Sequence, residues 1–128
     1  MDMDLELLVL QRQIARRLNQ WLGQECLPLD ETDLLLLLIV AQKARLHQRQ
    51  VADYLALNAA HVTRLVHKLV VLGYLEQMPD DFDRRRKQLG LTTLGEKVVT
   101  RAQKMLGVWQ QQNQLFKAGL HDLIGQSH

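Results

Sequence analysis

Two helices separated by almost no chain are the feature that most constrains the fold. A short helical segment fits residues 48–56, and a longer amphipathic one fits 59–72, so only Leu57 and Asn58 connect them. Asn58 is a favoured N-cap residue, and Gly73 is well suited to end the second helix. The spacing therefore predicts a helix-turn-helix pair at the centre of the chain.

The flanking segments predict further helices and one β-hairpin. Residues 74–78 alternate and run into the turn residues Pro79-Asp-Asp, as a strand entering a loop does. The remaining expected elements are a helix over 5–22, a helix capped by Asp30 or Thr32 that runs to about Gln42, a return strand over 87–91, a helix capped by Thr92 or Thr93 that continues to about Ala118 and ends at Gly119, and the opening turn of a sixth helix over 120–124.

Composition places the chain among single-domain globular proteins. The 128 residues are 47% hydrophobic and 23% charged, which excludes disorder. The longest apolar run, 34–41, is far below the ~20 residues that cross a bilayer. The N-terminus is acidic where a secretory signal is basic. Cys26 is the single cysteine and has no disulfide partner within the chain, so we expect a cytoplasmic protein that does not enter a membrane.

The charges are unevenly distributed. The net charge is only +2, but between Leu34 and Leu75 the single acid Asp53 stands against five cations, and residues 84–87 read Arg-Arg-Arg-Lys. A local basic surface on a nearly neutral protein suits contact with phosphate. A solvated basic surface without a partner is the alternative.

The longer helix of the pair has the dimensions and composition for a DNA groove. Its apolar residues share one face, at positions 62, 65, 66, 69 and 72. The major groove is ~12 Å wide, about the diameter of a helix with its side chains. Ala59 and Ala60 at its leading end are small enough to let the backbone approach base edges closely.

Several short motifs occur in order from the second helix of the pair onward. The stretch His61-Val-Thr-Arg-Leu-Val-His-Lys-Leu is followed by Leu72-Gly-Tyr-Leu-Glu, and Asp83-Arg-Arg-Arg-Lys-Gln-Leu-Gly precedes Leu91-Thr-Thr-Leu-Gly. Taken together they resemble the MarR family of bacterial regulators. The resemblance implies a fold that is mainly α with a small β-wing, a winged helix-turn-helix domain flanked by N- and C-terminal dimerisation helices.

The resemblance also implies DNA-contacting residues. Within the recognition helix, 59–72, these are Ala59, Ala60, His61 and Arg64 near the bases and Thr63, His67 and Lys68 nearer the phosphates. Arg64 is the best candidate for a bidentate contact to guanine. In the wing, the hairpin over 74–91, Asp83 and Arg85 match the family's Asp-x-Arg pair, with Arg84, Arg86 and Lys87 beside them. The arginine of that pair enters the minor groove, where a cation can sense groove width, and the aspartate fixes its pose.

A homodimer on a pseudo-palindromic duplex is the expected assembly. The resemblance implies one domain over 1–128, with a DNA-binding lobe over 30–95 and dimerisation helices over 3–23 and 94–126. The first helix is apolar on two stripes, and the last continues the pattern at 98, 102, 105, 109 and 116, so both can serve a partner chain. A small aromatic or phenolic effector is also implied, with a possible pocket formed by Trp21, Tyr54, Met105 and Trp109. Plain core packing is the alternative for these four.

Other chemistry has little support in the sequence. No paired carboxylates, nucleophile–base motif or glycine-rich phosphate loop points to an enzyme, and no catalytic residue is proposed. The five histidines show no metal-ligand spacing, so we expect no metal and no cofactor. Some relatives sense peroxide through a cysteine early in the first helix, whereas Cys26 follows that helix, which favours an inert thiol. The alternative function is a protein-binding winged-helix module or antirepressor without intrinsic DNA binding.

Overall fold

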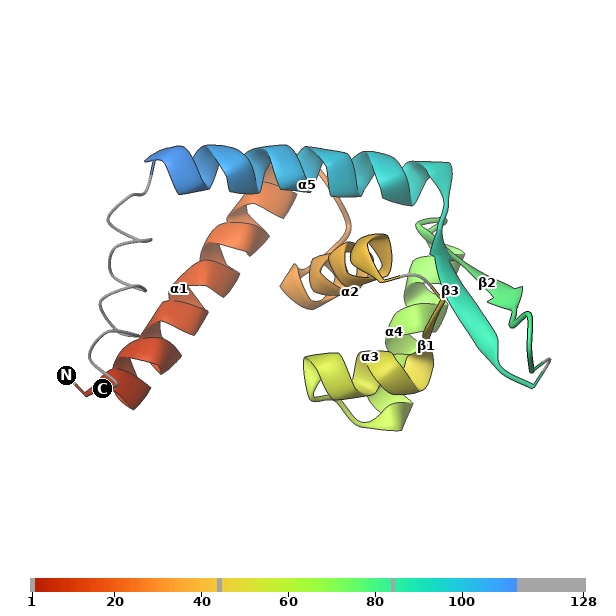
Figure 1. Cartoon of the computed structure of the whole chain (residues 1–128). Helices are drawn as coiled ribbons and strands as arrows, with labels where there is room; N and C mark the ends of the chain where they lie inside the picture. Colours follow the sequence, from red (N-terminus) through yellow and green to blue (C-terminus); the bar gives the residue numbers. More distant parts are fainter. Residues whose placement is uncertain (1, 44, 84, 113–128) are drawn as a thin grey trace. The chain divides into compact units, whose positions relative to one another are not determined.

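A computed structural model describes residues 2–43, 45–83 and 85–112 of the chain. The described elements are α1 (Met3–Gln24), α2 (Glu31–Gln42), β1 (Leu46–His47), α3 (Gln48–Leu55), α4 (Ala59–Val71), β2 (Leu75–Pro79), β3 (Lys87–Leu91) and α5 (Thr93–Gln112) (Figure 1). They fall into two compact units, one over Thr32–Thr100 and one that contains α1 and the part of α5 from Arg101. None of the described helices is both long and apolar enough to cross a membrane.

The helix pair forms as its sequence predicts. α3 ends at Ala56, whose backbone is left-handed with φ of 52°, and Asn58 then caps α4 by accepting the backbone N–H of His61 at 2.8 Å. α4 buries Val62, Leu65, Val66 and Leu69, one face of the helix. The chain leaves α4 through Gly73, which has a φ of +86° that favours glycine. The expected turn, cap and stop residues are confirmed, although Leu72 is 36% exposed and does not extend the buried face.

A three-stranded antiparallel sheet follows the order β1-β3-β2. The hairpin β2–β3 was expected and is confirmed. In the structure, Leu75 lies opposite Leu91 and Pro79 lies opposite Lys87. β1 was not expected, because two residues are too few to show an alternating pattern. It pairs with the other edge of β3, with Leu46 opposite Leu89. The wing is therefore hydrogen-bonded to the segment that leads directly into α3.

The core of the Thr32–Thr100 unit is built from aliphatic side chains on every one of its elements, together with Tyr74 in the turn before β2. α2 buries Leu34, Leu36, Leu37 and Val40, and these share the interior of the unit with side chains from the helix pair, the sheet and the start of α5, namely Leu46, Val51, Val62, Leu65, Val66, Leu69, Tyr74, Leu75, Leu89, Val98 and Val99. Burial of this many large side chains, at about 1.5–3 kcal/mol each relative to exposure, is the main force that orders the lobe.

In the other unit, α1 is buried only in its C-terminal half. Leu18 and Leu22 are buried, whereas the four apolar residues Leu5, Leu7, Leu8 and Val9 are 37–60% exposed. Two polar contacts orient α1 within this unit. The Arg17 guanidinium lies 4.2 Å from the centre of the Trp109 ring, and the Asn19 side chain bonds both the backbone N–H and the carboxylate of Glu31. Within the described part of this unit, the first half of α1 thus presents exposed apolar side chains.

The start of α5 is locked to the turn after α4. The Thr92 hydroxyl donates to the Gly73 carbonyl at 2.6 Å and accepts the Gly95 N–H at 3.1 Å, so Thr92 is the N-terminal cap. A Cβ built on Gly95 would lie 2.2 Å from the Tyr74 carbonyl oxygen, so only glycine fits. The Leu-Thr-x-x-Gly motif is therefore a structural joint. The predicted end of this helix, with Phe116, Ala118, Gly119 and the short helix over 120–124, lies outside the described residues.

An ion pair ties α4 to α2. Asp33 is fully buried, and the Lys68 ammonium lies 2.6 Å from its Oδ2 atom. A carboxylate without water is costly unless a cation and hydrogen bonds compensate it. Lys68 was expected near DNA phosphates, and its side chain is 45% exposed, but its charged end has this intramolecular partner.

Replacing Gly95 by alanine should destabilise the lobe by about 2 kcal/mol, because the added methyl overlaps the Tyr74 carbonyl and forces the α5 joint apart. Gly107→Ala is the matched control, since a Cβ at Gly107 meets nothing within 4 Å. Chemical denaturation of both variants measures the difference. Equal stability of the two would contradict the joint.

Replacing Lys68 by methionine should lower the free energy of unfolding by about 2–3 kcal/mol, because the buried Asp33 carboxylate loses its cation. The loss should be smaller than for a fully buried pair, since the lysine side chain is half-exposed. Combining Lys68→Met with Asp33→Leu should recover most of the loss, since the buried charge is then gone. Denaturation of the single and double variants is the measurement. A double variant less stable than Lys68→Met would show that the charge is not the cause.

Candidate nucleic-acid interface

The solvent side of α4 carries the residues that were predicted to contact bases. Ala59, Ala60, His61 and Arg64 are all exposed, and the two alanines form the first turn of the helix. The opposite face packs into the core. The helix can therefore present this surface to a partner without disturbing the residues that hold it in place.

The residues predicted to lie nearer phosphates differ in their environments. His67 is exposed. The Thr63 hydroxyl lies 3.0 Å from the Ala59 carbonyl and 3.3 Å from Gln48 Oε1 on α3, so it contacts groups within the protein. Lys68 is held by Asp33, as described above. Among these three residues, Thr63 and Lys68 have the intramolecular contacts just given, which leaves His67 as the best placed for a phosphate.

Asp80 shapes the loop between β2 and β3. Its Oδ1 atom accepts the backbone N–H of Phe82 at 2.7 Å and that of Asp83 at 3.2 Å, and its own N–H donates to the Arg86 carbonyl at 3.1 Å. The Phe82 N–H and the His47 side chain are the main causes that lower the pKa of Asp80 to about 2. The carboxylate is therefore ionised at any pH at which the protein would function.

Asp83 in turn holds the two arginines that follow it in the described chain. Its Oδ1 atom accepts the Arg85 N–H at 3.0 Å, and its Oδ2 atom lies 3.9 Å from Arg86 Nε. The Arg86 N–H donates to the Asp83 carbonyl at 3.0 Å, which closes the turn. The side chains of Arg85, Arg86 and Lys87 are exposed. Arg84, also predicted as a wing contact, lies outside the described residues.

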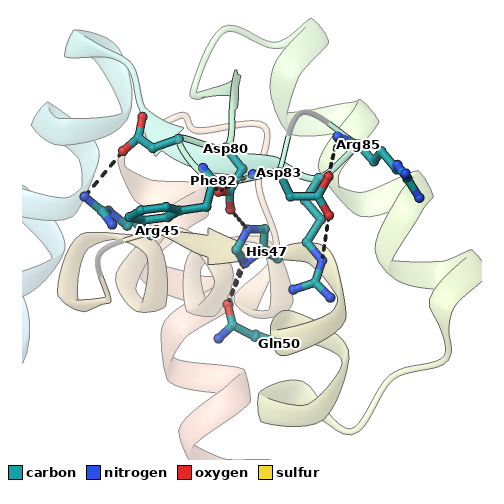
Figure 2. Close-up of polar contacts among 9 residues, drawn as sticks. Arg45, His47, Gln50, Asp80, Phe82, Asp83 and Arg85 are labelled. Carbon is teal, nitrogen blue, oxygen red and sulfur yellow. Dashed lines mark hydrogen bonds and ion pairs between the residues drawn. The ribbon is translucent and has the colours of Figure 1, made fainter.

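His47 connects the wing loop to the helix pair, and sequence reasoning missed it together with Asp80. Figure 2 shows its ring between Gln50 and Asp80, with Nε2 2.5 Å from Asp80 Oδ2 and Nδ1 3.3 Å from Gln50 Oε1. The His47 backbone N–H also donates to Gln50 Oε1 at 2.9 Å, at the start of α3. The Pro-Asp-Asp stretch was a signal that an Asp side chain shapes this turn. Its partner, 33 residues earlier, carried no such signal.

A hollow of about 500 Å³ lies between the start of α3 and the wing. Its walls contain four basic residues, with polar side chains between them, and its lining is His47, Gln48, Arg49, Gln50, Gln77, Arg85, Arg86 and Lys87. Cations together with the N–H groups at a helix N-terminus favour an anion. The hollow has the chemistry to hold a phosphate group.

The other candidate residues are distributed over both units. Trp21, Met105 and Trp109 are half-buried in the unit that contains α1, whereas Tyr54 belongs to the Thr32–Thr100 unit, is 55% exposed, and lies 5.7 Å from the Lys43 ammonium. Their role as an effector pocket stays a prediction. Cys26 is exposed just after α1. No three His, Cys, Asp or Glu side chains within the described ranges are grouped to bind a metal ion.

Comparison with known proteins agrees with this geometry. Residues 27–86 match the MarR family model. Among solved structures, reduced MarR from E. coli superimposes with a TM-score of 0.83 at 18% identity, over 99% of this chain and 96% of that chain. A complex of S. aureus MepR with DNA gives 0.73 at 21%, over 96% of each chain. A MarR transcriptional regulator from Methanosarcina mazei gives 0.74 at 19%, over 92% of this chain and 88% of that chain. None of the curated proteins compared with the chain matches it.

The matched segment begins before α2 and ends in the wing loop, so it contains the helix pair and β2 but not β3. The structural matches extend over almost the whole chain and show that α1 and α5 also belong to the shared fold. Residues 27–86 are thus similar to the MarR family, and the chain has the winged helix-turn-helix fold of the solved MarR and MepR structures.

Proposed function

We propose that this protein is a sequence-specific, double-stranded-DNA-binding transcription regulator that acts as a homodimer and represses the genes it controls. The observation that carries the proposal is the joining of an exposed, acid-free recognition helix to a wing of arginines through one small sheet, β1-β3-β2. Each copy then presents two basic elements to one duplex, held at a constant separation by backbone hydrogen bonds.

The recognition helix supplies direct readout of bases. Its small first turn at Ala59 and Ala60 permits close approach to base edges, and Arg64 stands one turn further along the exposed side. A guanidinium can donate two parallel hydrogen bonds to guanine O6 and N7. His61 lies beside Arg64 for further contacts, and His67 is placed for phosphate.

The wing supplies contacts to the backbone and the minor groove. Arg85 is exposed at the hairpin turn, and Asp83 holds its backbone in place. An arginine on a thin ribbon can enter the narrow, strongly negative minor groove. The cationic hollow between the wing and α3 then accepts a phosphate of the intervening backbone, which fixes the register of the lobe on the duplex.

The exposed apolar half of α1 supports the dimer. Leu5, Leu8 and Val9 lie on one side of this helix and Leu7 lies on the other, and all four are exposed. A second copy of the same helix is the partner that two-fold symmetry provides for these side chains. A dimer presents two recognition helices, which suits half-sites about one helical turn, roughly 34 Å, apart. S. aureus MepR, which has the same fold, has been crystallised with DNA.

Release of the operator by a small aromatic or phenolic ligand belongs to the same proposal. Such a ligand would act by favouring one separation of the two recognition helices over another. Trp21, Met105 and Trp109, which belong to the unit that contains α1, are the residues proposed to contact it. We also propose that the protein acts in the cytoplasm, and we assign no catalytic role to any residue.

Arg85→Ala should weaken binding to a duplex selected from a random-sequence pool by about tenfold, since it removes one wing contact worth about 1–3 kcal/mol. The slope of log K against log salt should become shallower by about one charge. Lys97→Ala, an exposed cation on α5, is the matched control and should leave both values unchanged. Fluorescence anisotropy over a salt series measures them. A wild-type protein that is monomeric by sedimentation and binds no duplex at low salt would overturn the proposed function in favour of a protein-binding module.

Arg64→Ala should relax base preference at one position in each half-site, because the guanine there loses its bidentate partner. Affinity for random duplex should change far less than affinity for the selected sequence. Repeating the selection with the variant measures the preference at every position. A preference profile identical to that of the wild-type protein would remove Arg64 from base readout.

A further inference from the structure

The contacts of the wing loop form a continuous path from the helix pair to the exposed arginines. His47 Nε2 lies 2.5 Å from Asp80 Oδ2, and the other oxygen of Asp80 accepts the N–H groups of Phe82 and Asp83. Asp83 then accepts the Arg85 N–H and lies beside Arg86 Nε. Figure 2 shows these groups in sequence, from Gln50 through His47 and Asp80 to the turn that carries Arg85.

The residues of this path also make backbone hydrogen bonds, so their side-chain contacts fix the positions of backbone segments. His47 is the residue before α3, and its backbone pairs with Gln88 of β3. Asp80 begins the loop and also holds the far end of it, because its N–H donates to the Arg86 carbonyl. The Asp80 side chain is only 9% exposed and that of His47 21%, so water competes little for this contact.

We infer that His47 and Asp80 are a positioning pair that sets the pose of Arg85 and Arg86 relative to the recognition helix. The inference rests on the proposed function and deepens it, since it names the residues outside the DNA surface that determine how the wing meets the duplex. Neither residue needs to touch DNA. Both act through the two arginines, which touch it.

Electrostatics alone predicts the opposite effect, which makes the inference testable. Asp80 is an anion beside a cationic surface formed by Arg49, Arg85, Arg86 and Lys87 around the hollow, and Asp81 and Asp83 are the other acids of the loop. Removing one negative charge from such a surface should by itself tighten binding to a polyanion. If Asp80 positions the arginines, removing its charge should instead weaken binding.

Asp80→Asn is the variant of choice. The amide oxygen can still accept the N–H groups of Phe82 and Asp83, so the turn is kept, while the charge-assisted contact to His47 is lost. Asp81→Asn is the matched control. It makes the same charge change one residue later, where the carboxylate forms an exposed ion pair with Arg45 at 3.3 Å.

Anisotropy titrations should use the selected duplex for both variants, alone and in an Arg85→Ala/Arg86→Ala background. Asp80→Asn should weaken binding about fivefold, whereas Asp81→Asn should bind as tightly as wild type or more tightly. In the double-alanine background the effect of Asp80→Asn should vanish, because the groups it positions are gone. A merely structural role would give the same loss in both backgrounds.

His47→Asn keeps the inference testable if Asp80→Asn does not fold, and it should show the same background-dependent loss. Thermal unfolding of every variant confirms that folded protein is compared. Equal affinities for Asp80→Asn and Asp81→Asn would overturn the inference and leave DNA binding intact. If the wild-type protein itself binds no duplex, the proposed function is overturned instead.

Discussion

The backbone pairing between β1 and β3 is the constraint on which the rest of the lobe depends. Two residues, Leu46 and His47, are hydrogen-bonded to the strand that also forms the wing. Without this pairing the hairpin would be a two-stranded ribbon attached to the lobe only through its ends, and isolated ribbons are marginally stable in water. With it, the hairpin and the helix pair share one sheet, and a rotation of one requires a rotation of the other.

Several residues that carry the family resemblance hold the fold together rather than face solvent. Thr92 and Gly95 join α5 to the turn after α4, and Gly73 provides the left-handed backbone of that turn. Lys68 ties the recognition helix to α2 through a buried carboxylate. The recognition helix is thus anchored to the core at its C-terminal end. This arrangement suits a helix whose other side must remain free of intramolecular contacts.

Local patterns in the sequence predicted the local structure well. Asn58 and Gly73 marked the ends of α4, and the apolar spacing at Val62, Leu65, Val66 and Leu69 identified its buried face. These signals depend on neighbours within one or two helical turns, so they can be read from the chain directly. The expected antiparallel hairpin is likewise confirmed, because turn residues separate two short strands.

Long-range pairings could not be predicted in the same way. β1 is too short for periodicity, and Asp33 and Lys68 are 35 residues apart, so no pattern in the sequence pairs them. His47 and Asp80 are separated by a similar distance along the chain and became a pair only in the folded lobe. The family resemblance implied a phosphate contact for Lys68, but its described partner is the Asp33 carboxylate inside the protein.

The wing loop contains residues that its turn requires and residues that can be replaced. Asp80 shapes the loop through backbone N–H groups, which every residue except proline possesses, so the side chains at 81 and 82 are not needed for the turn itself. Phe82 is 85% exposed. In descendants of this chain these two positions are free to drift and acquire new surface chemistry, provided that the loop keeps its length. The hairpin tip is thus a place where evolution can alter recognition without first rebuilding the fold.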